Sequence, residues 1–110
     1  MEERGINREA LYSIGKGFYR EPEESPAFSD VTIRFRTLRE DVDRVLLYLP
    51  DEQQIYPMQL ESSDHYFDYY EMEIKLKDKP LHYYFRIEKG EEVIHYNRLG
   101  VTEDLDIQYA

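Results

Sequence analysis

From Ser29 onward, apolar and polar residues alternate along the chain with a period of two. In residues 31–37 (VTIRFRT), Val31, Ile33 and Phe35 fall on one side of an extended chain, and polar residues fall on the other. Because successive side chains of a strand point to opposite faces, this pattern predicts a strand with one buried face. Beyond the first dozen residues, no segment has the 3.6-residue period that a helix would require.

Two further segments have strand character and follow turn-forming residues. Residues 44–49 (RVLLYL) are almost continuously apolar, which predicts a strand covered on both faces. Residues 53–61 (QQIYPMQLE) form a weaker strand, and Pro57, which has no amide hydrogen, predicts an edge position or a bulge. We expect a turn at residues 38–43 (LREDVD) and a loop at residues 62–65 (SSDH).

Residues 66–76 (YFDYYEMEIKL) place four aromatic rings within their first five positions. A period of two divides these rings between two faces. Phe67 and Tyr69 are predicted to point outward. The predicted core face consists of apolar residues at even positions, with Tyr66 in phase at the start: Tyr70, Met72, Ile74 and Leu76.

A four-residue loop at residues 77–80 predicts a hairpin between this strand and residues 81–88 (LHYYFRIE). Every core-facing residue would then have an apolar partner: Leu76 with Leu81, Ile74 with Tyr83, Met72 with Phe85, and Tyr70 with Ile87. On the other face, Glu71 would lie opposite Arg86. A second turn at Lys89 and Gly90, pairing Glu88 with Glu91, would extend the hairpin into a three-stranded meander over residues 66–97.

The number and spacing of these segments predict an all-β fold, an immunoglobulin-like antiparallel β-sandwich of about six to eight strands. Residues 1–28 are expected to form an N-terminal segment with a short strand at residues 8–13 (REALYS) and a loop rich in glycine, proline and acids. Residues 29–100 would form the sandwich, and residues 101–110 the start of a linker. At 110 residues, these parts belong to one domain.

The net charge of −10 excludes several classes of partner. Binding to nucleic acid or to an anionic membrane surface needs a basic patch, so neither is expected. No apolar run is long enough to cross a membrane, and residues 1–12 lack the apolar run of a secretory signal. The chain has no cysteine, which favours a reducing compartment, and we expect a cytoplasmic location.

No constellation of residues predicts catalysis, a cofactor or a metal. His82 and His95 would point outward as diagonal neighbours on adjacent strands; a metal pair is conceivable, but two solvated polar residues explain them better. The acids cluster in turns, as solvated charges do, and no glycine-rich nucleotide loop is present. The chain is therefore not expected to be an enzyme by itself.

The outward aromatic side chains are the remaining candidates for a binding site. Aromatic faces stack on sugar rings, and tyrosine hydroxyl groups add hydrogen bonds. The alternative is that these rings pack against the N-terminal segment, the second sheet or a neighbouring domain. The candidate residues are Phe67, Tyr69, Tyr84, Tyr48 and Tyr56.

Several of these segments resemble the N-terminal β-sandwich domain of the neopullulanase, cyclomaltodextrinase and maltogenic amylase group of the α-amylase family, carbohydrate-binding module family 34. VTIRFRT followed by EDVDRVLLY resembles that family's IRLRT and D-V-x-x-V-x-L patterns. SSDHYFDYYEMEI resembles its S-D-x-x-F-D-Y-Y signature. REALY resembles its opening strand, and PLHYYFRIEKGEEVIHYNRLG resembles its R-Y-Y-F and Y-N-x-x-G ending.

The resemblance implies an accessory domain that precedes a catalytic (β/α) barrel carrying the catalytic carboxylates. Such a barrel needs about 250 residues, so the sequence would be a piece of a larger α-glucan hydrolase. The resemblance implies two roles. One is binding of α-glucan or cyclodextrin, and the other is packing over the catalytic cleft of a second subunit, which shapes the active site. Residues 50–56 (PDEQQIY) lack the tryptophan-containing loop common in the family. A purely structural or dimerisation domain therefore stays open as the alternative.

Overall fold

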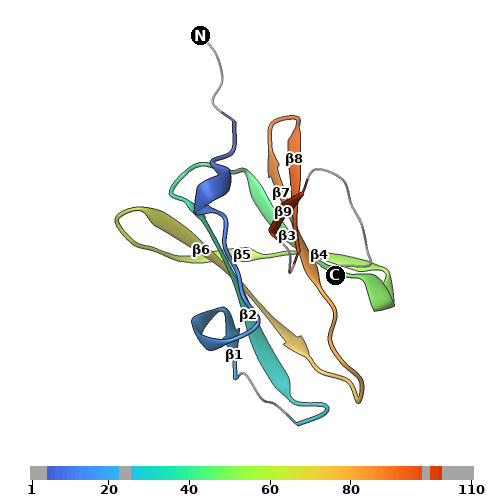
Figure 1. Ribbon diagram of the computed structural model, residues 1–110. Coiled ribbons are helices and arrows are strands. Elements are labelled where there is room, and N and C mark those ends of the chain that lie inside the picture. Colours follow the sequence, from blue (N-terminus) through green and yellow to red (C-terminus); the bar gives the residue numbers. More distant parts are fainter. Residues whose placement is uncertain (1–4, 23–25, 98–99, 103–110) are drawn as a thin grey trace.

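A computed structural model describes residues 5–22, 26–97 and 100–102 of the chain. In these residues, nine strands form two antiparallel sheets that pack face to face, which confirms the all-β sandwich (Figure 1). We call the sheet with strand order β1-β2-β6-β5 sheet A and the sheet with order β4-β3-β7-β8-β9 sheet B. Within the described ranges, no helix is long and apolar enough to cross a lipid bilayer.

Each sheet combines strands from two separate parts of the sequence. Sheet A contains β1 (Arg20–Glu21), β2 (Asp30–Leu38), β6 (Phe67–Lys75) and β5 (Gln59–Ser63). Sheet B contains β4 (Gln54–Pro57), β3 (Arg44–Leu49), β7 (Tyr84–Lys89), β8 (Glu92–Asn97) and β9 (Gly100–Thr102). Three short 3₁₀ turns complete the described elements: η1 (Arg8–Ala10), η2 (Gly17–Tyr19) and η3 (Pro50–Glu52).

The core lies between the sheets and is built from the predicted face of β2. Ile33 and Phe35 are fully buried, and the Phe35 ring lies 4.5 Å from that of Phe85 on sheet B. Burying each such side chain stabilises the fold by about 1.5–3 kcal/mol. β3 is buried on both faces, as its continuous apolar sequence predicts: Leu46 points away from Val45 and Leu47, yet all three are buried.

The predicted hairpin between residues 66–76 and 81–88 is wrong. β6 pairs with β2 and β5 in sheet A, whereas β7 pairs with β3 and β8 in sheet B. The connection at residues 76–83 crosses from one sheet to the other. The predicted core face of β6 is nevertheless correct for Tyr70, Ile74 and Leu76, which are buried. An apolar face can be covered by the opposite sheet as well as by a neighbouring strand, and alternation does not distinguish the two.

The remaining details of the predicted meander also change. Glu71 pairs with Arg34 of β2, not with Arg86, which forms an ion pair with Glu88 at 2.8 Å. Tyr66 is largely exposed instead of continuing the core face.

The β7–β8 register is shifted by two residues from the predicted one. Lys89 lies opposite Glu92, and Gly90 and Glu91 make the turn, with Gly90 at a φ of 57°. This register places Glu88 opposite Val93 and so avoids the predicted pairing of two acids. A shift of two residues preserves the faces, so the third strand still presents its apolar side to the core.

Residues 53–61 form two edge strands instead of one. β4 lies at the edge of sheet B and β5 at the edge of sheet A, which confirms the edge position expected from Pro57. Met58 joins them; its side chain is buried and its amide donates to the carbonyl oxygen of Val45 at 2.9 Å. Ser62 and Ser63, expected in a loop, belong to β5, whose pairing with β6 is irregular between Leu60 and Ser62.

The N-terminal segment follows the free edge of β2. The expected strand at residues 8–13 is reduced to η1 and a single bridge between Tyr12 and Arg36. Ile6 and Leu11 are buried in the core, and the amide of Ile6 donates to Glu92 at 2.8 Å. Of the expected linker at residues 101–110, the first two belong to β9 and the rest lie outside the described residues.

Candidate functional site

The outer face of sheet A carries alternating charged and aromatic side chains. On β2, Arg34 and Arg36 point away from the core, because they alternate with Ile33 and Phe35, which point into it. On β6, Tyr69 lies opposite Arg36 and Glu71 lies opposite Arg34. The same alternation that buries the core therefore places cations beside aromatic rings on the other face.

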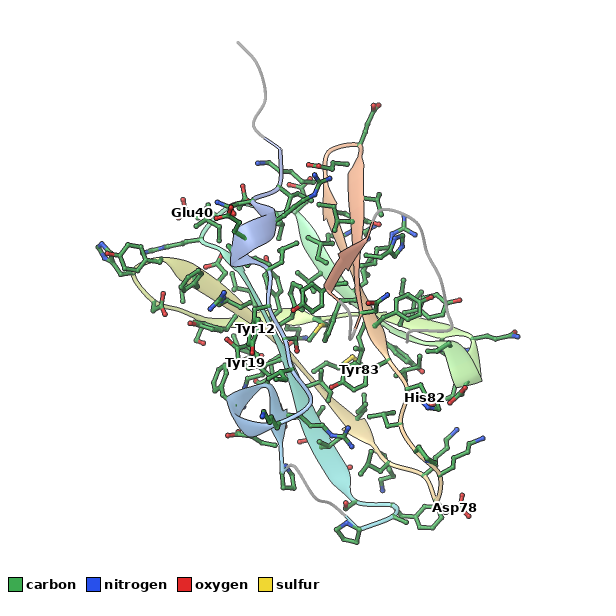
Figure 2. The ribbon with its side chains drawn as sticks, viewed as in Figure 1. Tyr12, Tyr19, Glu40, Asp78, His82 and Tyr83 are labelled. Carbon is green, nitrogen blue, oxygen red and sulfur yellow. The ribbon has the colours of Figure 1, made fainter. Side chains whose placement is uncertain are left out.

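The N-terminal segment folds over this face and adds three more rings. Tyr12 and Tyr19 meet edge to face at 5.1 Å, and Figure 2 shows them side by side along β2. Phe18 contacts both Tyr19, at 5.3 Å, and Tyr69, at 5.4 Å, with ring planes near perpendicular. Edge-to-face pairs of this kind contribute about 0.5–1.5 kcal/mol each beyond the area that they bury.

Arg36 lies over two of these rings. The guanidinium carbon of Arg36 lies 5.2 Å from the centre of the Tyr12 ring and 4.2 Å from that of Phe67. The Arg36 side chain also donates to the carbonyl oxygen of Ala10 at 3.0 Å. Burial raises the pKa of Tyr19, against the opposing effect of the nearby Arg36. The Phe67 ring, predicted as a contact surface, is thus occupied by a cation of the same chain.

Asp64 fixes the loop between β5 and β6. Its side chain accepts hydrogen bonds from the amides of Tyr66, at 2.9 Å, and Phe67, at 2.7 Å, and from the hydroxyl group of Tyr69, at 2.8 Å. These bonds, led by the two from the amides, hold the pKa of Asp64 below its ordinary value. Burial, with the bond to Asp64, raises the pKa of Tyr69 to about 12. The carboxylate is therefore ionised and the phenol neutral at physiological pH.

Asp68 anchors the same loop from the buried side. Its carboxylate accepts from the hydroxyl group of Ser63 at 2.6 Å and from the amide of Glu40 at 2.9 Å. Asp64 thus holds the loop to the start of β6, and Asp68 links β6 to the end of β5 and to the turn after β2. Side chains on this loop are held in defined positions before any ligand arrives.

A hollow of about 400 Å³ lies between the loop and the N-terminal segment. Its lining combines aromatic rings with hydroxyl groups and a carboxylate; the lining residues are Phe18, Tyr19, Tyr69, Ser62, Ser63 and Asp64. Because the Tyr69 hydroxyl group donates to Asp64, its oxygen can still accept a hydrogen bond. Apolar rings beside a few fixed polar groups suit a neutral ligand that has ring faces and hydroxyl groups.

The five predicted site residues fall into three places. Phe67 and Tyr69 lie together on sheet A. Tyr48 and Tyr84 lie on the outer face of sheet B, where their rings stack at 4.7 Å with 15° between the planes. Tyr84 points outward as predicted, but it is only 2% exposed, so its ring offers little surface to a ligand. Tyr56 is half-buried on β4 and packs against the core.

Phe18, Tyr19 and Asp64 were not among the predicted residues. Phe18 and Tyr19 lie in η2, in a stretch whose glycines and prolines indicate only a loop. Their two adjacent rings after Gly17 were the available signal, but no periodicity connects them to β6. Asp64 precedes an aromatic run, and only its turn geometry assigns it a role.

The histidines do not lie as predicted. His82 precedes β7 and its ring nitrogen lies 2.9 Å from a carboxylate oxygen of Asp51, whereas His95 pairs with Arg86 in the ladder and packs its ring edge to face with Tyr84. They are therefore not diagonal neighbours. In the described ranges, no group of three or more potential ligands could hold a metal ion.

Comparisons with known proteins give one family and one fold. The sequence model of the family described as "Alpha amylase, N-terminal ig-like domain" matches residues 8–109. Among solved structures, a cyclomaltodextrinase has a similar fold, with a TM-score of 0.75 and 21% sequence identity. The similarity covers 92% of this chain but 18% of the cyclomaltodextrinase chain. The chain thus corresponds to a small part of that protein.

Proposed function

Because the chain belongs to the family of N-terminal Ig-like domains of α-amylases, we propose that it is a carbohydrate-binding module of family 34 type that contributes to α-glucan binding. In this proposal, the parent chain is an α-glucan-degrading glycoside hydrolase, and the domain docks beside its catalytic (β/α) barrel and helps to shape the active site. The domain itself supplies no catalytic group to the reaction.

The observation that supports sugar binding is the hollow on sheet A. It combines the rings of Phe18 and Tyr69 with the oxygens of Ser62, Ser63 and Asp64. A glucose unit has apolar ring faces and a rim of hydroxyl groups, so it matches both the rings and the polar groups of this lining. A neutral α-glucan also suits a domain with a net charge of −10, since no charged ligand has to approach it.

Titration with a sugar tests the proposal directly. We expect β-cyclodextrin or maltotriose to shift the NMR signals of Phe18, Tyr19 and Tyr69 in the 110-residue chain. Tyr69→Ala should weaken binding roughly two- to tenfold, which corresponds to the usual contribution of one aromatic contact. Tyr48→Ala is the matched control, because Tyr48 lies on the outer face of sheet B. The absence of any response at millimolar sugar would contradict autonomous binding.

A second candidate function is a structural or dimerisation domain of the same enzyme. It is favoured by a mainly apolar hollow of about 570 Å³ between β4 and the end of β6, whose lining includes Phe28, Leu49, Tyr56 and Met72. Phe28 is 64% exposed, and exposed apolar surface of this kind is typical of an interface. Deleting residues 1–100 from the parent enzyme should then change its oligomeric state, and an unchanged state would argue against this function.

A further inference from the structure

The hollow on sheet A is assembled from two separate parts of the chain. Phe18 and Tyr19 come from η2 in the N-terminal segment, whereas Tyr69 and Asp64 come from β6 and the loop before it. The N-terminal part lies against sheet A through η2 and the two-residue strand β1. The shape of the hollow therefore depends on whatever holds this short segment against the sheet.

Arg34 holds both parts at once. One of its terminal nitrogens donates to the carbonyl oxygen of Phe18 at 2.7 Å and to the carboxylate of Glu21 at 2.6 Å. Its other side faces β6, where the Nε atom donates to Glu71 at 2.9 Å. The guanidinium group also lies over the Phe18 ring, 4.5 Å from its centre. A single side chain thus connects η2, β1 and β6.

The position of Arg34 fits a role in docking. Its side chain is 19% exposed and sits between two carboxylates, Glu21 and Glu71. Burial lowers its pKa, but the hydrogen bonds to these carboxylates outweigh burial and raise it. The planar guanidinium fork can bond two partners and stack on a ring together, which a lysine ammonium cannot do. Arg34 itself does not line the hollow.

We propose that Arg34 is a positioning residue of the carbohydrate site: it docks residues 17–21 onto sheet A, and this docking sets the affinity for α-glucan. The proposal rests on the function proposed above. If only a fraction of molecules has the segment docked, the apparent dissociation constant rises by the inverse of that fraction. By reciprocity, a sugar that binds the docked form must in turn stabilise the docking.

The test compares three variants with the wild-type chain. Arg34→Gln removes the charge and the fork, Arg34→Lys keeps the charge and removes the fork, and Arg44→Gln is the matched control. Arg44 also bonds a carboxylate, that of Glu88, but on sheet B. Affinity for β-cyclodextrin and maltotriose is measured by calorimetry, with thermal unfolding recorded for each chain.

We expect Arg34→Gln to weaken binding about tenfold and Arg34→Lys by a similar factor, with Arg44→Gln within about twofold of wild type. Amide hydrogen exchange gives a second measurement, because a purely structural role of Arg34 would not make the exchange rates depend on sugar. Sugar should slow exchange in residues 18–21 of the wild-type chain and do so less in Arg34→Lys. If Arg34→Gln fails to fold, Arg34→Lys decides the question by the same two measurements.

The outcomes separate this inference from the proposed function. If the wild-type chain binds sugar and both Arg34 variants bind it equally well, the role of Arg34 is overturned while the sugar site stands. If Arg44→Gln weakens binding as much as the Arg34 variants, the effect is general and the role is likewise overturned. If the wild-type chain binds no sugar, the proposed function fails and this inference fails with it.

Discussion

The rings of Phe18 and Tyr69 meet edge to face at 5.4 Å. Phe18 lies in η2, just before the edge strand β1, whereas Tyr69 lies on β6, and β2 separates β1 from β6 in the sheet. The contact is possible because η2 folds over the outer face of sheet A and its segment is held there by Arg34. One pair of rings thus reports whether the N-terminal segment is docked. Its state can be followed without any ligand.

Loss of this pair should leave the sandwich folded. Phe18 is 45% exposed, so Phe18→Ala removes a ring contact without opening a hole in the core. We expect the free energy of unfolding to fall by about 1–3 kcal/mol, because Phe18 forms edge-to-face pairs with both Tyr19 and Tyr69. Urea unfolding followed by fluorescence measures it. A loss of several kcal/mol would mean that the N-terminal segment contributes to the core through Phe18.

Tyr69 should titrate late at alkaline pH. Its pKa rises from the ordinary 10.0 to about 12 in the folded chain, mainly through burial and then through the bond to Asp64. A group whose folded-state pKa is raised contributes stability below its unfolded pKa. This contribution is therefore complete below pH 10 and is lost as the pH rises through about 12.

Carbon-13 NMR of labelled tyrosine rings measures this titration. Asp64→Asn removes the charge that opposes ionisation and should shift the midpoint of Tyr69 toward its ordinary value. Titration of Tyr69 near pH 10 in the wild-type chain would contradict the short bond between the two side chains.

Asp64 should show the opposite dependence at acid pH. Its pKa lies below the ordinary 3.8, because the amides of Tyr66 and Phe67 and the hydroxyl group of Tyr69 all donate to the ionised form. The stability that this carboxylate contributes is present above pH 3.8 and is lost as the pH falls through the lower folded-state value. Chemical shifts of the Asp64 carboxyl carbon, followed from pH 6 downward, would report the midpoint; a midpoint above 3.8 argues against the loop geometry.

Asp41 should be the most sensitive carboxylate for stability. Its side chain is 4% exposed, lies 3.0 Å from the ammonium group of Lys89 and accepts the amide of Asn7 at 2.7 Å. Asp41→Ala leaves both donors without this acceptor, and we expect a loss of about 3 kcal/mol in the free energy of unfolding. Asp78→Ala in an exposed turn is the control and should change stability by less than about 0.5 kcal/mol. Equal effects from both variants would argue against an internal ion pair.

The core can be tested by making the same isoleucine-to-valine substitution at a buried and at an exposed position. Ile33 is fully buried, and Ile55 on β4 is 41% exposed. Deleting one methylene from a packed core costs about 1 kcal/mol, so Ile33→Val should lower the free energy of unfolding by that amount. Ile55→Val should change it by less than about 0.5 kcal/mol. Similar values for both would mean that β2 does not face the core.

The strands and their buried faces could be predicted because the signal is local. Val31, Ile33 and Phe35 alternate with polar residues, and the structure buries all three. The partner of a strand is different, because β6 presents the same apolar face whether β2 or β7 lies beside it. Pro57 predicted an edge, but only the three-dimensional structure shows that Met58 carries the chain from one sheet to the other.

The candidate site was predictable only in part, and for a related reason. The period of two identified Tyr69 as an outward ring. The ring that it meets, Phe18, lies in a segment without any period, so nothing in the sequence connects the two. Tyr84 shows the reverse problem: its direction was correct, yet stacking on Tyr48 and the surrounding chain leave it buried. The face to which a side chain points follows from the local sequence, whereas its exposure to solvent depends on what packs over it.

The crossing from β6 to β7 has a consequence for the order in which the domain is made. All four strands of sheet A end by Lys75, whereas Phe85, Ile87 and Ile94 of sheet B lie farther along the chain. During synthesis from the N-terminus, the apolar face of sheet A is therefore complete when only β3 and β4 of the opposite sheet have been made, so part of this face is still uncovered. Such an uncovered face is prone to aggregate, so the nascent chain is most exposed to misfolding while β7 and β8 are being translated.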